Sequence, residues 1–176
     1  MGAYPDPRQC CADVPGKFRV GTRPRARRGD IARLEGCWYG NNAKIYIVST
    51  SGFIGQGQIW EYDPRAETIS LLFQSPGAQV LNMPDNITVS PRGGLVLCED
   101  GSGEQFLHGL TTDGEVFPFA KNMVRLNGER NGIVGDFTGS EWAGACHSPD
   151  GRWLFANIQS PGITFAITGP WSAGAL

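Results

Sequence analysis

The chain has 176 residues, of which 40% are hydrophobic and 18% are charged, and its net charge is −2; this composition is typical of a soluble globular domain. Its 25 Gly and 12 Pro indicate a turn-dense, all-β chain rather than a helical one. It contains no run of about 18 apolar residues, which excludes a transmembrane helix and gives no reason to expect a membrane partner.

Residues 1–30 carry seven Lys/Arg against three Asp/Glu, with Pro, Gly and Arg scattered without a period. We expect this basic segment to be irregular and disordered. It lacks interleaved aromatic residues and any nucleic-acid-binding motif, so we expect no nucleic-acid partner. Arg27-Arg28 is similar to a twin-arginine export signal, but charged residues follow where an apolar stretch is required. The chain as written therefore predicts a cytoplasmic location.

From residue 31 onward, turn signals recur about every 8–12 residues between short β-rich runs, which is typical of a sandwich, barrel or propeller. Lys44–Thr50 is one predicted strand. Gly57–Tyr62 and Thr68–Phe73 are predicted to form a hairpin, and the same pattern returns at Phe106–Leu110 and Glu115–Phe119.

One longer pattern occurs twice, at Asp85–Gly101 and at Glu141–Asn157. Each copy runs from a short strand through a Ser-Pro-x-Gly turn into an apolar strand. Internal repetition of about 40–58 residues with short strands in each unit predicts propeller blades. The sequence predicts two nearly complete blades, at about 35–75 and 84–120, and a third from residue 136 that lacks its end.

Propellers typically have four to eight blades, so these units predict a partial β-propeller and a chain that is a piece of a larger protein. Residues 31–176 form this propeller part. Residues 121–135 are predicted to be a loop between blades.

Acidic side chains stand at the ends of the predicted inner strands in three successive blades. They are Glu35, Asp85, Glu99, Asp100 and Glu141. Carboxylates brought together on a propeller axis repel one another and require cations or raised pKa values. Hard cations such as calcium take six to eight oxygen ligands, which clustered carboxylates supply. The pattern therefore predicts one wall of a metal site.

Ordinary turns are the alternative interpretation for Asp85-Asn86 and Asp100-Gly101, since such side chains bond their own backbone. Glu35 and Glu141 are harder to explain in this way. Each directly precedes a strand start that contains Gly and Trp, where a surface turn does not require Glu.

The sequence offers little other chemistry. Gly-x-Ser-x-Gly is absent and no Ser-His-Asp set can be assembled, so no catalytic nucleophile is predicted and the catalytic residues remain unknown. Arg92, in a Pro-Arg-Gly-Gly turn, could hold a phosphate group with its planar guanidinium. A solvent-facing turn arginine is the alternative.

Ten short motifs between about residues 31 and 171 resemble those of the PhoX-type alkaline phosphatases. They occur in the order expected for the C-terminal part of such a protein. They are Glu35–Gly40, Val48–Gly52, Gly57–Tyr62, Pro84–Ile87, Pro91–Leu95, Cys98–Gly101, Glu141–Gly144, Ser148–Gly151, Phe155–Gln159 and Ala166–Trp171.

The resemblance implies about three blades of a six-bladed ring. It also implies export by the twin-arginine route and hydrolysis of phosphate monoesters by a calcium and iron cluster held mainly by carboxylates. Glu35, Glu99 and Glu141 are then the first candidates for metal ligands, and Asp85 and Asp100 the second. The complete protein is expected to be a monomer.

Because N-terminal blades are missing from the match, we expect this chain to be incomplete and inactive by itself. Two alternatives stay open. The propeller could be a calcium-dependent lactonase or esterase, since fold does not settle function. It could also be a non-enzymatic propeller fragment.

Overall fold

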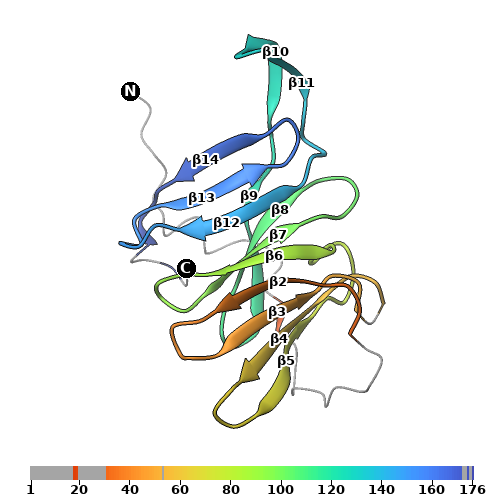
Figure 1. Cartoon of the computed structure of the whole chain (residues 1–176). Coiled ribbons are helices and arrows are strands. Elements are labelled where there is room, and N and C mark those ends of the chain that lie inside the picture. The colour runs from red at the N-terminus through yellow and green to blue at the C-terminus, as the bar shows by residue number, and fades with distance from the viewer. Residues whose placement is uncertain (1–17, 20–30, 53, 172–173, 175) are drawn as a thin grey trace.

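The computed structural model describes residues 18–19, 31–52, 54–171, 174 and 176, and these residues form four antiparallel sheets (Figure 1). The all-β prediction is confirmed. Within the described residues no helix could cross a membrane. The predicted disorder of residues 1–30 lies outside the described residues, except at Phe18 and Arg19.

Three of the sheets follow the chain in the positions of the three predicted blades. The first sheet consists of β2 (Leu34–Tyr39), β3 (Ile45–Ser49), β4 (Gln58–Asp63) and β5 (Thr68–Gln74). The second consists of β6 (Pro84–Val89), β7 (Leu95–Glu99), β8 (Phe106–Leu110) and β9 (Glu115–Lys121), with β1 (Phe18–Arg19) paired to β9. The third consists of β12 (Trp142–His147), β13 (Leu154–Ile158) and β14 (Ile163–Ile167).

The doubled Ser-Pro-x-Gly pattern forms the same turn in the second and third sheets. The amide of Gly93 donates to the carbonyl of Ser90 at 2.8 Å, and the amide of Gly151 donates to the carbonyl of Ser148 at 2.9 Å. Both glycines have a positive φ, +98° and +67°, which glycine adopts without steric cost. The two predicted hairpins are also present, as β4–β5 and β8–β9.

The predicted loop at residues 121–135 is wrong, because its chain forms most of a fourth sheet. This sheet is a hairpin of β10 (Arg125–Arg130) and β11 (Ile133–Asp136), and it stands clear of the three larger sheets (Figure 1). Asn131 and Gly132 form its turn with φ values of +52° and +79°. Asn-Gly is the preferred pair for a two-residue turn of this kind, so the sequence carried a signal for the hairpin.

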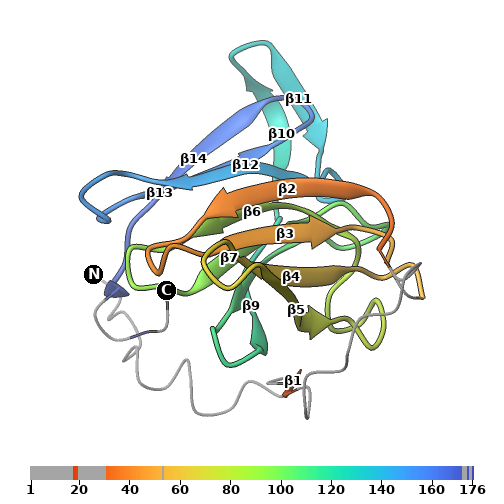
Figure 2. The same ribbon diagram turned by 60° about the horizontal axis from the view of Figure 1, so that its bottom comes forward.

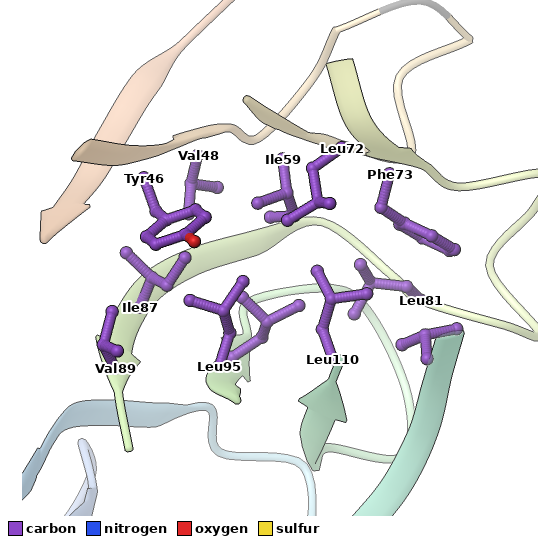
Figure 3. Close-up of a cluster of buried hydrophobic side chains, with 12 residues drawn as sticks. Tyr46, Val48, Ile59, Leu72, Phe73, Leu81, Ile87, Val89, Leu95 and Leu110 are labelled. Atoms are coloured by element: carbon purple, nitrogen blue, oxygen red, sulfur yellow. The ribbon is translucent and has the colours of Figure 1, made fainter. Parts of the chain in front are cut away.

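The second sheet has an apolar core on each of its two faces, because successive side chains of a strand point to opposite faces. On β7, Leu95 and Leu97 face the first sheet, whereas Val96 and Cys98 face the third sheet. Figure 3 shows the core toward the first sheet, where Tyr46, Val48 and Ile59 lie opposite side chains of the second sheet. Burying a side chain of this kind contributes about 1.5–3 kcal/mol, so the two cores hold the three sheets together.

β2, β6 and β12, the first strands of the three larger sheets, lie side by side with β6 in the middle (Figures 1 and 2). Gly36 lies against the backbone of Asp85 near their beginnings: a Cβ on Gly36 would be 2.6 Å from the Asp85 carbonyl oxygen. At their far ends, Asn41 Nδ2 donates to the carbonyl of Ser90 at 3.1 Å, and Gly151 lies against Pro91. The three strands therefore run in the same direction and begin at the same end of the molecule.

Candidate metal centre

A β-bulge occurs near the beginning of each of these three strands. The pairing register shifts between Leu34 and Cys37 in β2 and between Pro84 and Asn86 in β6. It shifts again between Ala143 and Cys146 in β12, shortly after Glu141. Bulges break the strict alternation of a strand and re-aim its side chains. They occur here at the end of the molecule where the acidic residues lie.

Three acidic residues meet at this end. Asp85 lies on β6, Asp100 directly follows β7, and Glu141 directly precedes β12. One carboxylate oxygen from each lies within 4.8 Å of the other two, and all three side chains are half-buried. The cluster joins the second sheet to the third, although Glu141 is far from the other two residues in the sequence.

The cluster concentrates negative charge where water is partly excluded. Burial, followed by the charges of Asp100 and Glu35, raises the pKa of Asp85 from 3.8 to about 6. Burial also raises the pKa of Glu141 from 4.5 to about 7, together with a hydrogen bond to Asp100 and the neighbouring charges. In addition, Oδ1 of Asp85 is buried without a hydrogen-bond partner among the described residues. A cation would relieve the repulsion and supply that partner.

Glu35 lies at the rim of the cluster and is linked to it by an arginine that the sequence analysis missed. Arg33 Nη2 is 2.7 Å from Glu35 Oε1 and 3.7 Å from Asp100 Oδ2. The Arg33 side chain is 46% exposed, so its guanidinium also faces solvent. No sequence pattern indicated this position, because Arg33 precedes β2 and has a φ of +53°.

Glu99 is buried beside the cluster, with its carboxylate engaged elsewhere. Oε1 accepts the amide of Asn82 at 2.7 Å and lies 2.9 Å from His108 Nε2. Oε2 accepts the amide of Phe106 at 3.0 Å. The structure does not bring Glu99 into the group of Asp85, Asp100 and Glu141, and its role as a ligand stays a prediction.

Arg92 lies at the opposite end of β6 from Asp85. Its guanidinium donates to the carbonyl of Trp171. Together with Asn41 and Tyr46 it lines a surface cavity of about 300 Å³. The structure therefore does not place Arg92 beside the carboxylates. A residue that binds the substrate at the carboxylates has to come from another part of the chain.

The donor set suits a metal ion. Asp85, Asp100 and Glu141 offer oxygen atoms only, which hard cations prefer, and one of these atoms lacks any other partner among the described residues. These residues could hold a metal, and their mutual repulsion without one is the physical reason to expect it.

The protein-family model described as alkaline phosphatase PhoX matches residues 16–162. The chain belongs to the PhoX alkaline phosphatase family. The match includes Arg33, Glu35 and the three clustered carboxylates, and it begins inside the basic segment that precedes residue 31. PhoX membership implies alkaline phosphatase activity and a phosphoester substrate. None of the curated proteins matches the chain.

Proposed function

We propose that this PhoX family member is a metal-dependent phosphomonoester hydrolase whose metal centre includes Asp85, Asp100 and Glu141. The observation that carries the proposal is the meeting of these carboxylates within 4.8 Å in a chain of this family. The buried, partnerless Oδ1 of Asp85 supports it, because a buried polar atom without a partner is costly.

Calcium and iron are the metals we propose, from family membership and from the oxygen donors of the cluster. When bound, such cations neutralise phosphate charge, polarise P–O bonds and activate an oxygen nucleophile. Burial first, and then Asp100 and the other neighbouring carboxylates, raises the pKa of Glu141 to about 7. Ligands must lose their protons to bind a metal, so metal affinity will rise with pH.

We assign phosphate binding to Arg33 rather than to Arg92. The Arg33 guanidinium lies against Glu35 and Asp100 and is nearly half exposed. Its planar fork of N–H donors matches phosphate oxygens, and its charge is already at the cluster. Glu35, which holds Arg33 in place, is a further ligand candidate at the rim.

We further propose that the three larger sheets are neighbouring blades of a β-propeller. β2, β6 and β12 are then the innermost strands, and the carboxylates lie at one mouth of the channel that they line. The shared direction of these strands and the apolar cores between successive sheets support this arrangement.

The activity is tested with the purified full chain and p-nitrophenyl phosphate. Although the missing blades led us to expect an inactive chain from the sequence, the meeting of three carboxylates in this chain leads us to expect hydrolysis that a chelator abolishes and that calcium with iron restores. Asp100→Asn should reduce kcat/KM by about 100-fold, because a cluster ligand is lost. Asp136→Asn is the matched control, since Asp136 lies on the exposed hairpin and pairs with Arg125.

Two outcomes would contradict the proposal. Metal-dependent hydrolysis of a lactone or of p-nitrophenyl acetate, without hydrolysis of the phosphate ester, would favour the lactonase or esterase alternative. A chain that binds metal but hydrolyses none of these substrates would favour a non-enzymatic propeller fragment.

A further inference from the structure

Glu99 is a buried carboxylate that lies outside the cluster of Asp85, Asp100 and Glu141. Its side chain is 3% exposed, and that of its neighbour His108 is 7% exposed. The amides of Asn82 and Phe106 donate to its two oxygens at 2.7 and 3.0 Å, and the Nε2 of His108 lies 2.9 Å from Oε1. An ionised carboxylate has about four acceptor positions, and two of those of Glu99 are taken by backbone amides. Glu99 is thereby fixed between three chain segments.

One of these segments is a strained turn before β6. Met83 follows Asn82 directly and has a φ of +50°, in the left-handed region that non-glycine residues rarely adopt. Such a conformation persists only where surrounding contacts impose it. The contacts here include the bond from the Asn82 amide to Glu99 and a bond from the Met83 amide to the carbonyl of Gln56 at 3.0 Å.

The strained turn connects the two carboxylates of the second sheet. The amide of Asp100 donates to the carbonyl of Met83 at 3.0 Å, and Asp85 lies two residues after Met83. Asn82 Nδ2 also donates to the carbonyl of Ser102 at 3.2 Å, beyond Asp100. The Asn82–Met83 segment therefore links Glu99 to both Asp85 and Asp100.

We infer that Glu99 and His108 are a positioning pair for the metal centre, with Glu99 outside the metal's own ligands; this inference rests on the proposed function. His108 orients the Glu99 carboxylate, Glu99 holds the turn at Met83, and the turn presents Asp85 and Asp100 to Glu141. Groups that orient metal ligands in this way affect metal affinity strongly without touching the metal.

The test measures Tb³⁺ binding to the full chain by luminescence, with Glu99→Gln, His108→Gln and the double variant. We expect each single change to weaken Tb³⁺ binding by about 10-fold or more. The double variant should be no weaker than the worse single variant, since both act through one contact. The number of water molecules on the bound Tb³⁺, from lifetimes in H₂O and D₂O, should stay that of the wild type. His147→Gln is the matched control, because His147 lies at the far end of β12 beside Trp171.

The sign of the His108→Gln effect separates positioning from simple charge. Removing a histidine beside Glu99 adds no positive charge, so an effect of charge alone would leave cation binding unchanged or strengthen it. Unchanged or stronger Tb³⁺ binding in His108→Gln overturns the inference. An added water on Tb³⁺ in Glu99→Gln, with normal binding in His108→Gln, would instead make Glu99 a ligand.

Amide hydrogen exchange of the metal-free proteins tests the same pair without a metal. We expect faster exchange at Met83 and Asp100 in both single variants and no change there in His147→Gln. If Asp100→Asn binds Tb³⁺ as tightly as the wild type does, the proposed metal centre fails. Amide exchange alone then tests whether Glu99 and His108 hold the segment at Met83. Unchanged exchange at these two amides overturns the positioning pair. If Glu99→Gln does not fold, His108→Gln decides each comparison.

Discussion

Asp85 is held where its negative charge is unfavourable. Its pKa is raised from 3.8 to about 6 by burial first and then by Asp100 and Glu35, while Oδ1 has no hydrogen-bond partner among the described residues. The pKa of Glu141 is raised from 4.5 to about 7 by similar causes. In the metal-free protein both residues therefore oppose folding when they are ionised, and a bound cation removes the opposition.

This predicts a pH dependence of stability. Between about pH 4 and pH 7 the folded, metal-free chain binds more protons than the unfolded chain, so its free energy of unfolding falls as the pH rises. The loss should be on the order of 1 kcal/mol per residue, since solvent screens both half-buried groups. Asp85→Asn should remove the part of this loss that is due to Asp85, and so stabilise the protein at pH 8 but not at pH 4. Urea unfolding in the presence of a chelator measures the free energy of unfolding at both pH values. Equal effects at the two pH values would contradict the prediction.

Arg33 provides the second prediction at this scale. Arg33→Lys keeps the charge but removes the planar fork, and we expect it to raise KM for p-nitrophenyl phosphate by about 10-fold with a smaller change in kcat. Arg125→Ala is the control, because Arg125 is an exposed arginine paired with Asp136 on the hairpin. Steady-state kinetics measure both. A similar KM for Arg33→Lys and the wild type would exclude Arg33 from phosphate binding.

At the scale of the elements, the close contact of β2 with β6 places Glu35 beside Asp85. Gly36 makes this contact possible, because a Cβ there would be 2.6 Å from the Asp85 carbonyl oxygen and 2.9 Å from the Ile87 amide nitrogen. Both atoms belong to the backbone of β6, whose Ile87 and Val89 are buried in the core toward the first sheet, so they cannot move aside easily.

Gly36→Ala should therefore destabilise the protein by about 1–3 kcal/mol, the usual cost of overpacking. Gly128→Ala is the matched control, since Gly128 is also a strand glycine and a Cβ there meets nothing within 4 Å. Thermal unfolding of the two variants measures the difference. If both variants melt at the same temperature, β2 and β6 are not in the close contact described here.

The elements also show what the sequence could and could not predict. Alternating apolar residues and repeated turns were sufficient for the strands of the three larger sheets, because these signals are local. The β10–β11 hairpin was missed although Asn131-Gly132 signals it. The meeting of Asp85, Asp100 and Glu141 was expected only through the propeller hypothesis, since their distances depend on how separate sheets pack. The hydrogen bonds of Glu99 and the position of Arg33 depend on backbone conformations at Met83 and Arg33 that no sequence pattern indicated.

At the scale of the whole molecule, the metal centre and the fold depend on each other. Two apolar cores align the first strands of three sheets, and this alignment brings the acidic strand ends to one place. The far end of the same strands carries the repeated turns and Arg92, without the clustered carboxylates. A metal at the acidic end would connect the second sheet to the third and stabilise the fold, because it binds only the folded arrangement.

The most direct test is the metal content of the purified full chain. The chain is loaded with calcium and iron, free ions are removed, and the bound metal is measured by elemental mass spectrometry. We expect bound metal in the wild type and in Asp136→Asn, and loss of metal from the triple variant Asp85→Asn, Asp100→Asn, Glu141→Gln. Circular dichroism should show that the triple variant keeps its β structure, since it also loses the charge repulsion. Equal metal content in the wild type and in a folded triple variant would contradict a metal centre at these carboxylates.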